Sequence, residues 1–226
     1  MKWLDYWQQL ASTEQDPLRQ VARVRSQGDF EQEDIEKLAG HLAHLLDLQP
    51  GDRLLDLCCG NGLLTQRLAT RCADITGVDL APAMIQTAKA QFSAPNISYL
   101  VGNVVEVDRL VNGPFDKILL HFSFQYLERK EGEQALAAMS KLLTPTGRIV
   151  LGDVPERERL VNFYRNPLIR ARYKLDRLRG KDNMGKFWST AELQQAIAPL
   201  GLQLNRKAQP EGFPYAHYRA DFVIYR

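Results

Sequence analysis

The sequence predicts an α/β protein built on a doubly wound, mostly parallel sheet with helices on both faces. Three observations carry this prediction. From residue 53 onward, short apolar runs typical of buried strands alternate with segments of helical periodicity. The first run leads into the turn Gly60-Asn61-Gly62, and Asp79 ends the second run roughly 20 residues later. That distance lets the chain cross one helix and return along a neighbouring parallel strand.

Residues 1–49 predict two or three short amphipathic helices ahead of this core. Two apolar sets repeat at helical spacing, namely Trp3, Leu4, Trp7 and Leu10, then Ile35, Leu38, Leu42, Leu45 and Leu46. Asp16-Pro17 and Gly28-Asp29 interrupt the pattern, and Pro50-Gly51-Asp52 is a turn. We therefore divide the chain into an N-terminal helical cap, 1–49, and a core, 50–226.

The elements of the core alternate regularly at first. Strands are expected at 53–59, 74–79, 97–101, 115–122 and 147–152. Helices are expected at 62–70, 82–92 and 132–143, and Pro82 suits the first turn of its helix. In such a sheet the ligand lies outside the carboxyl ends of the strands, near the first strand, where the strand order reverses.

The last third of the chain departs from this rhythm. Residues 153–187 are basic and aromatic, with helical character through 166–179, and they predict an insertion. Ser189 and Glu192 then resemble a capping box that opens a helix to about residue 199. Two final strands are expected at 202–207 and 219–225, and no second domain or internal repeat is apparent.

Composition narrows the class of protein. The 226 residues are 45% apolar and 25% charged, as in ordinary globular domains, and three cysteines do not form a disulfide framework. The start of the chain has no apolar leader and no apolar run reaches the ~18 residues of a membrane span, so we expect a cytoplasmic protein with no membrane span. A net charge of +2 does not by itself indicate nucleic acid.

Charge is nevertheless uneven along the chain. Residues 157–181 contain nine basic residues and only two acids, Glu158 and Asp176. This segment is suited to an anionic substrate, to RNA or to an acidic membrane surface, and a solvated helix face is the plain alternative.

Asp56 lies within the first expected strand, four residues before the glycine turn. An acid there suits a cationic ligand and would repel a pyrophosphate. The motif Asp56…Gly60-Asn61-Gly62, followed by Asp79, by Phe-Asp-x-Ile-Leu-Leu at 115–120 and by Leu-Thr-Pro-Thr-Gly-Arg-Ile-Val-Leu at 143–151, resembles the class I, Rossmann-like S-adenosylmethionine-dependent methyltransferases. The family often has a glycine two residues after the acid, where this chain has Cys58.

The resemblance implies a seven-stranded sheet of order 3-2-1-4-5-7-6 with its last strand antiparallel, and an N-terminal helical lid. It also implies S-adenosyl-L-methionine as methyl donor and S-adenosyl-L-homocysteine as product. Asp56 is then assigned to the methionine end of the donor, and Asp79 to the ribose hydroxyls. The other candidate cofactor-binding residues are Tyr6, Trp7, Gln20, Cys58, Gly60, Asn61, Gly62, Leu80, Met84, Gly102, Asn103, Val104, His121 and Phe122.

Several of these residues have a structural alternative. Core packing is the other role for Met84 and Trp7, and a strand-end cap is the other role for Asp56. Asn103 is expected to bond the adenine amino group, or else to serve as a simple turn residue.

Methyl transfer is an in-line displacement, so the protein aligns the reactants, excludes water and, for a hydroxyl acceptor, removes a proton. The candidate bases are His121, Asp153, Tyr126 and His217, and no metal site is expected. His41 and His44 are expected to be surface or packing residues. The segment 121–127 lacks the signatures of the enzymes that methylate exocyclic base amines or cytosine C5.

The leading hypothesis is O-methylation of a small molecule, such as a metabolite, natural product or glycan precursor, with the insertion contacting an anionic portion of it. The alternatives are an RNA methyltransferase that uses 157–181 and a non-catalytic cofactor-binding module. A dehydrogenase is disfavoured because the turn lacks a third glycine. The sequence does not indicate the oligomeric state.

Overall fold

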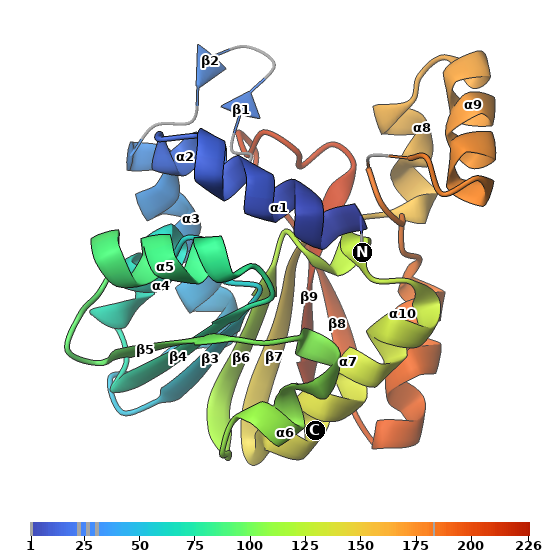
Figure 1. Ribbon diagram of the computed structural model, residues 1–226. Coiled ribbons are helices and arrows are strands. Elements are labelled where there is room, and N and C mark those ends of the chain that lie inside the picture. The colour runs from blue at the N-terminus through green and yellow to red at the C-terminus, as the bar shows by residue number, and fades with distance from the viewer. Residues whose placement is uncertain (1, 22–23, 26–27, 30–31, 183) are drawn as a thin grey trace.

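A computed structural model describes residues 2–21, 24–25, 28–29, 32–182 and 184–226. Seven strands form the central sheet in the order β5-β4-β3-β6-β7-β9-β8 (Figure 1). Their bounds are β3 (Arg53–Leu57), β4 (Asp74–Asp79), β5 (Ile97–Val101), β6 (Phe115–His121), β7 (Leu143–Pro155), β8 (Gln203–Ala208) and β9 (Arg219–Tyr225). Strand β9 runs antiparallel to both of its neighbours, β7 and β8, and the other neighbouring pairs in this sheet are parallel. The predicted order 3-2-1-4-5-7-6 is confirmed.

Strand β7 is longer than the expected 147–152. At its start Leu143 pairs with Phe115 of β6, and at its end Pro155 pairs with Arg219 of β9 across a register shift. Pairing with two neighbours extends the strand beyond its apolar run, which is why periodicity alone underestimates it.

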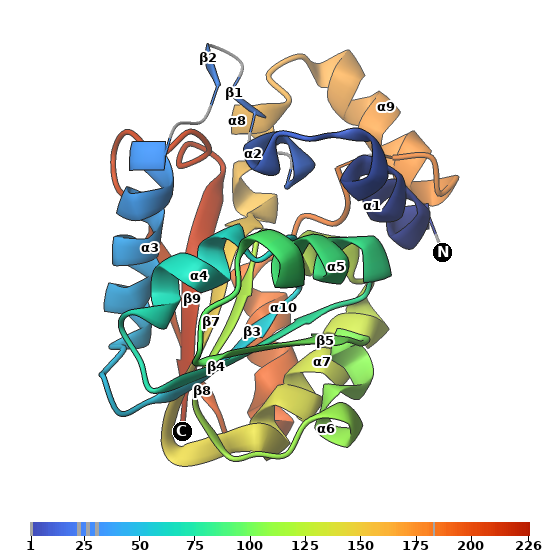
Figure 2. The same cartoon turned by 60° about the vertical axis from the view of Figure 1, so that its left-hand side comes forward.

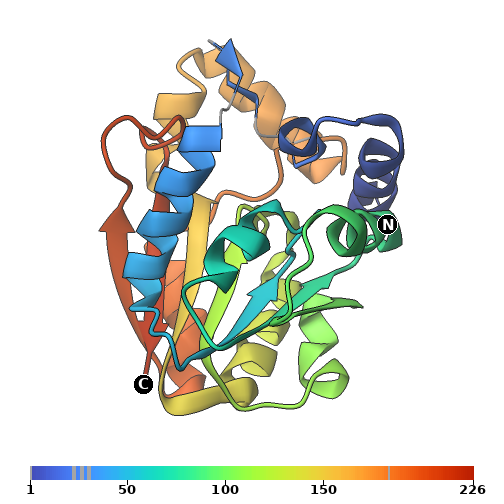
Figure 3. The ribbon, with the colours of Figure 1, turned by 90° about the vertical axis from the view of Figure 1, so that its left-hand side faces the viewer.

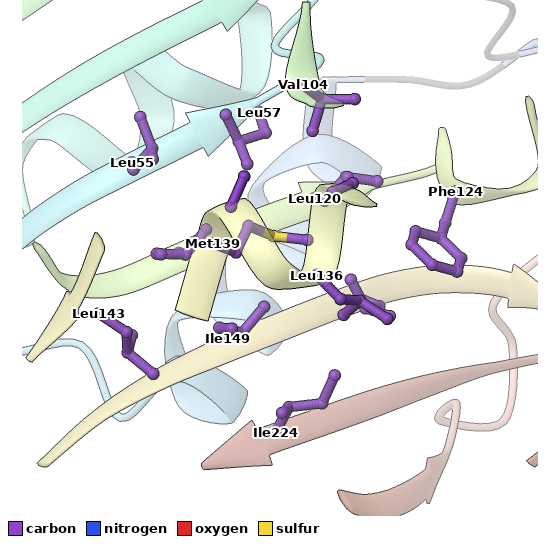
Figure 4. Close-up of a cluster of buried hydrophobic side chains, with 14 of the residues drawn as sticks. Leu55, Leu57, Val104, Leu120, Phe124, Leu136, Met139, Leu143, Ile149 and Ile224 are labelled. Carbon is purple, nitrogen blue, oxygen red and sulfur yellow. The ribbon is translucent and has the colours of Figure 1, made fainter. Parts of the chain in front are cut away.

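Helices cover both faces of the sheet. On one face, α3 (Gln32–Leu46) and α4 (Leu63–Ala69) share a buried cluster with strand residues such as Leu54 and Val150. On the other, α7 (Arg129–Leu142) and α10 (Thr190–Ile197) pack on the alternate strand residues. Figure 4 shows this second cluster, in which Leu136 and Met139 of α7 meet Leu120 and Ile149. Helix α5 (Pro82–Gln91) packs against β4 and β5, and the short α6 (Val107–Leu110) packs against α7.

The N-terminal segment divides into two parts with different positions. Helices α1 (Lys2–Thr13) and α2 (Pro17–Gln20) lie beyond the carboxyl ends of the parallel strands, as the views in Figures 1 and 2 both show. A small hairpin, β1 (Val24–Arg25) and β2 (Gly28–Asp29), follows them. Helix α3, in contrast, packs on the sheet, because its apolar stripe of Leu38, Leu42 and Leu46 belongs to the core. The segment 1–49 therefore combines a cover with one helix of the layered core.

The insertion forms η3 (Arg157–Arg159), α8 (Leu160–Phe163) and α9 (Pro167–Leu178), close to the predicted helical range. Asn166 caps α9 by accepting the N–H of Leu168 at 2.8 Å. Figure 3 shows α8 and α9, in orange, at the same end of the sheet as α1. Among the described helices, none combines the length and apolar character that crossing a bilayer requires.

Candidate active site

The glycine turn between β3 and α4 has a backbone shape that few residues adopt. Cys58, Gly60 and Gly62 have φ values of 54°, 58° and 82°. A Cβ on Gly62 would lie 2.5 Å from the Tyr99 hydroxyl, so no side chain fits there. The left-handed φ of Cys58 also explains why glycine suits this position in the family that the sequence resembles.

Asp79, the last residue of β4, fixes this turn from the neighbouring strand. Its Oδ2 accepts the N–H of Gly60 at 2.9 Å, and its Oδ1 accepts the N–H of Ala81 at 2.9 Å. Burial raises the pKa of Asp79, while these N–H bonds act in the opposite direction. The carboxylate is therefore held in one orientation before any ligand arrives.

Asp56 lies deeper in the fold, with only 2% of its surface exposed. Its Oδ2 accepts the hydroxyl of Thr65 at 2.6 Å. Burial, opposed by the Thr65 hydrogen bond and assisted by the charge of Asp79, raises the pKa of Asp56 to about 7. A buried carboxylate with this pKa becomes fully charged when a cation lies beside it.

Both acids line one cavity of about 360 Å³ at the carboxyl ends of β3, β4 and β6. The predicted cofactor-binding residues that line it are Trp7, Asp56, Cys58, Gly60, Asn61, Asp79, Leu80, Met84, Gly102, Asn103, Val104, His121 and Phe122. Their contact with a cofactor stays a prediction, but the fold brings all thirteen together.

Three predicted residues lie outside this lining, for different reasons. Tyr6 is exposed and packs edge-on against the Trp7 ring, with centroids 5.0 Å apart. Gln20 is buried and accepts a hydrogen bond from the Asn61 amide at 3.0 Å, so it supports the turn from behind. Gly62 faces Tyr99.

The side chain of Asn103 forms a hydrogen bond with the backbone. Its Oδ1 accepts the N–H of Val105 at 3.2 Å and caps η1 (Val104–Glu106). Asn103 therefore acts as a turn residue, which was the alternative to its predicted contact with adenine.

Aromatic side chains from α1 close the cavity. Trp3 and Trp7 pack against Tyr126 of η2 (Phe124–Tyr126), with ring centroids 4.3 and 5.7 Å apart. Trp3 and Leu4 line the cavity with Trp7 and share its helical stripe, although neither is among the residues predicted for the site. The stripe is the signal that would have identified them.

A second cavity, of about 420 Å³, also has His121 in its lining. His121 is buried and lines both cavities. The other lining residues are Asp34, Lys37, Leu38, Asp153, Gln209, Glu211, Gly212, Phe213, Pro214 and Tyr215. Sequence reasoning missed most of these because α3 and the loop before β9 are far apart in the chain.

Asp153 stands at the wall of the second cavity in a left-handed conformation, φ 59°. Its N–H donates to Asp221 Oδ1 at 2.7 Å, and its carbonyl accepts Arg219 Nη1 at 2.6 Å. The side chain accepts the Gln209 amide at 3.0 Å. Because this carboxylate is already engaged, Asp153 is a weaker candidate base than its strand-end position suggests.

Asp221 is also paired with His41, whose Nε2 lies 2.7 Å from Asp221 Oδ2. His41 packs edge-on against Phe213, with centroids 5.2 Å apart, in keeping with the expected packing role, and its ring also joins a buried carboxylate. Among the other candidate bases, Tyr126 lines the first cavity, whereas the exposed His217 lines neither and packs against Tyr218. Burial and the charge of Arg165 lower the pKa of His217.

Residues 54–147 match a family model described as a methyltransferase domain. This match supports a class I S-adenosylmethionine-dependent methyltransferase. The family uses S-adenosylmethionine.

Relatives are similar to this methyltransferase domain over different spans. The malonyl-[acyl-carrier protein] O-methyltransferase of Acetivibrio thermocellus is 35% identical over 40% of this chain and 33% of its own length. The ubiquinone biosynthesis O-methyltransferase of Azorhizobium caulinodans is 28% identical over 85% of this chain and 74% of its own. The first four curated relatives are matched over 33% to 48% of their length.

Solved structures share the fold. Magnesium protoporphyrin IX methyltransferase from Synechocystis, with bound SAH, has a TM-score of 0.66 at 16% identity and covers 100% of this chain and 94% of its own. A SAM-bound amino pentose methyltransferase from Micromonospora echinaspora has a TM-score of 0.62 at 22% identity, with 85% and 89% covered.

Proposed function

We propose that the chain transfers the methyl group of S-adenosylmethionine to a hydroxyl of a small-molecule acceptor. The observation that carries the proposal is the pair of acids at the carboxyl ends of β3 and β4, which face one cavity beside the glycine turn. Relatives named as O-methyltransferases support the same activity.

The residues present fit the donor. Asp79, already oriented by two N–H groups, accepts hydrogen bonds from the ribose hydroxyls. Asp56 provides the charge that complements the methionine ammonium and the sulfonium. Gly60, with φ 58°, lines the cavity without a side chain. The donor supplies an electrophilic methyl group, and the protein supplies alignment and exclusion of water.

We place the body of the acceptor in the second cavity, with its hydroxyl next to His121 and in line with the donor's methyl group and sulfur. His121 lines both cavities, so a proton that leaves the acceptor on one side of the ring is within reach of an imidazole nitrogen. The cavity wall carries Asp34, Asp153 and Glu211 against one Lys37. This excess of carboxylates favours a neutral or amine-bearing polar acceptor over an anionic one.

The direct test has two stages. Calorimetry with S-adenosylmethionine and S-adenosylhomocysteine should show binding of both. Incubation with a methyl-labelled donor and a fractionated cell extract should then place the label in the small-molecule fraction. Label in RNA would support the rival RNA methyltransferase, binding with no label in any fraction would support a non-catalytic module, and no binding would overturn the proposal.

Affinity for S-adenosylmethionine should rise with pH because of Asp56. Its pKa in the free protein is about 7, so it is mostly protonated at pH 6 and mostly ionised at pH 8, and only the ionised form attracts the cation. We expect a gain of about tenfold across this range. Titration calorimetry of the wild type and of Asp56→Asn checks this, and an equal gain in the variant would assign the effect to another group.

The same group affects stability in the opposite sense. The pKa of Asp56 is raised in the folded state, from its usual 3.8 to about 7, so the folded protein binds the proton more tightly. The proton contributes its full stabilisation of the fold below pH 3.8, the usual pKa of the group. This contribution is lost as the pH rises to about 7, the pKa in the folded protein. Thr65→Val removes the hydrogen bond that lowers this pKa and should move the midpoint of both effects upward.

Gly152→Ala should lower turnover by about tenfold to a hundredfold, because small displacements of reacting groups are costly. A Cβ at this position would lie 2.6 Å from His121 Cδ2 and 3.2 Å from Leu42 Cδ2, so the imidazole must move. Steady-state kinetics provide the measurement. Gly51→Ala is the matched control, since its Cβ would meet nothing within 4 Å. Unchanged turnover in Gly152→Ala would remove His121 from the mechanism.

A further inference from the structure

We propose that the outer face of α9 docks on an anionic lipid bilayer. This face presents Leu168, Leu175 and Leu178, which are 79%, 44% and 87% exposed. Their spacing of seven and three residues places them on one stripe of the helix. Of the nine exposed large apolar side chains among the described residues, five lie between 161 and 178. Exposed leucines gathered in this way mark an interaction surface.

The opposite face of α9 already holds the helix to the protein. Tyr173 stacks on Tyr164 with centroids 5.0 Å apart, and its hydroxyl donates to the Gly185 carbonyl at 2.9 Å. Arg177 donates to Glu128 at 2.8 Å and to Asp182 at 3.3 Å. These contacts of Tyr173 and Arg177 hold one face of α9 against the protein, so the leucine stripe points away from the core.

Basic side chains flank the stripe on both sides. At 100° per residue, Lys174 lies on one flank of the leucines, and Arg172 and Arg179 lie on the other. Arg172 is 3.5 Å from Asp176. Across the part of the chain that the structure describes, no carboxylate forms an ion pair with Arg165, Lys174, Arg179 or Lys181.

This combination favours a bilayer over RNA. Leucines enter the boundary between headgroups and acyl chains while lysine and arginine reach the lipid phosphates. RNA is bound by cations and stacked aromatic rings, and it gives three exposed leucines nothing to contact. Figures 1 and 2 place α9 at the same end of the sheet as α1, so docking turns this end of the sheet toward the lipid.

Co-sedimentation of the whole chain with two kinds of vesicle tests the proposal. The first vesicles contain phosphatidylcholine alone. The second contain equal amounts of phosphatidylcholine and phosphatidylglycerol. We expect binding to the mixture and little to the neutral vesicles. The triple variant Leu168→Ser, Leu175→Ser and Leu178→Ser should weaken binding by about a hundredfold or more. The pair Lys174→Gln and Arg179→Gln should weaken it by about tenfold or more.

Leu100→Ser is the matched control, since Leu100 is an exposed leucine on the edge strand β5 and should not contribute. Thermal unfolding of each variant checks the fold, and Leu178→Ser alone replaces the triple variant if that variant is destabilised. Equal binding to both vesicles, no binding, or wild-type binding by the triple variant (or by Leu178→Ser in its place) would overturn the proposal. RNA binding that needs the basic residues but not the leucines would also overturn it. None of these outcomes depends on methyl transfer.

Discussion

Asp79→Asn is expected to weaken the binding of S-adenosylmethionine by about tenfold to a hundredfold, the effect of losing a charge-assisted hydrogen bond. In the wild type the carboxylate is held by the N–H groups of Gly60 and Ala81. An amide of the same size has only one accepting atom, so it must give up either the turn or one ribose hydroxyl. Titration calorimetry gives the dissociation constant directly.

Asp74→Asn is the matched control for this measurement. Asp74 is the first residue of the same strand, at the end away from the cavity, and pairs with Arg53 at 3.6 Å. Its replacement should leave affinity for S-adenosylmethionine unchanged. Wild-type affinity in Asp79→Asn would contradict the ribose assignment, while the proposed methyl transfer would then need another anchor for the donor.

Arg219→Met is expected to lower the free energy of unfolding by about 3–5 kcal/mol, as removal of one partner from a buried charge pair does. Only 2% of Arg219 is exposed, and its Nε lies 4.0 Å from Oδ1 of the buried Asp153. Its Nη1 donates to the Asp153 carbonyl at 2.6 Å and to Gln125 Oε1 at 3.0 Å. The guanidinium also lies over the Phe122 ring, 4.6 Å from its centroid. Methionine keeps most of the volume but leaves the carbonyl and the Gln125 amide oxygen without this donor.

Denaturant unfolding of Arg219→Met and of Arg172→Met makes the comparison. Arg172 is an exposed arginine in an i,i+4 pair with Asp176, so its loss should change stability by about 0.5 kcal/mol or less. A similarly small decrease in the free energy of unfolding in both variants would show that the cluster around Asp153 does not stabilise the fold.

Local patterns predicted most of the fold and most residues that line the first cavity. The spacing from Asp56 through the glycine turn to Asp79 lies within one strand–helix–strand unit, so a single sequence window contains it. Strand β4 and helix α9 were likewise predicted closely, because periodicity and capping residues define them. Strand β7 pairs with β6 on one side and with β9 on the other, and the strand predicted there from periodicity was too short.

The second cavity could not be predicted in this way because it is assembled from distant segments. His41 and Asp221 are 180 positions apart, yet their side chains meet at 2.7 Å. The second cavity likewise joins α3 to the loop before β9. Neither segment carries a motif, and only the packing of α3 on the sheet brings them together.

Cys58 and Phe122 directly follow β3 and β6, Asp153 lies within the neighbouring strand β7, and each has positive φ without being glycine. This matters for how relatives are recognised. A search pattern that demands glycine two positions after the first acid passes over this chain, although its loop has the backbone shape that such a pattern is meant to detect. Patterns written in terms of chain conformation, with several residue types admitted at each such position, would recover proteins that strict consensus motifs discard.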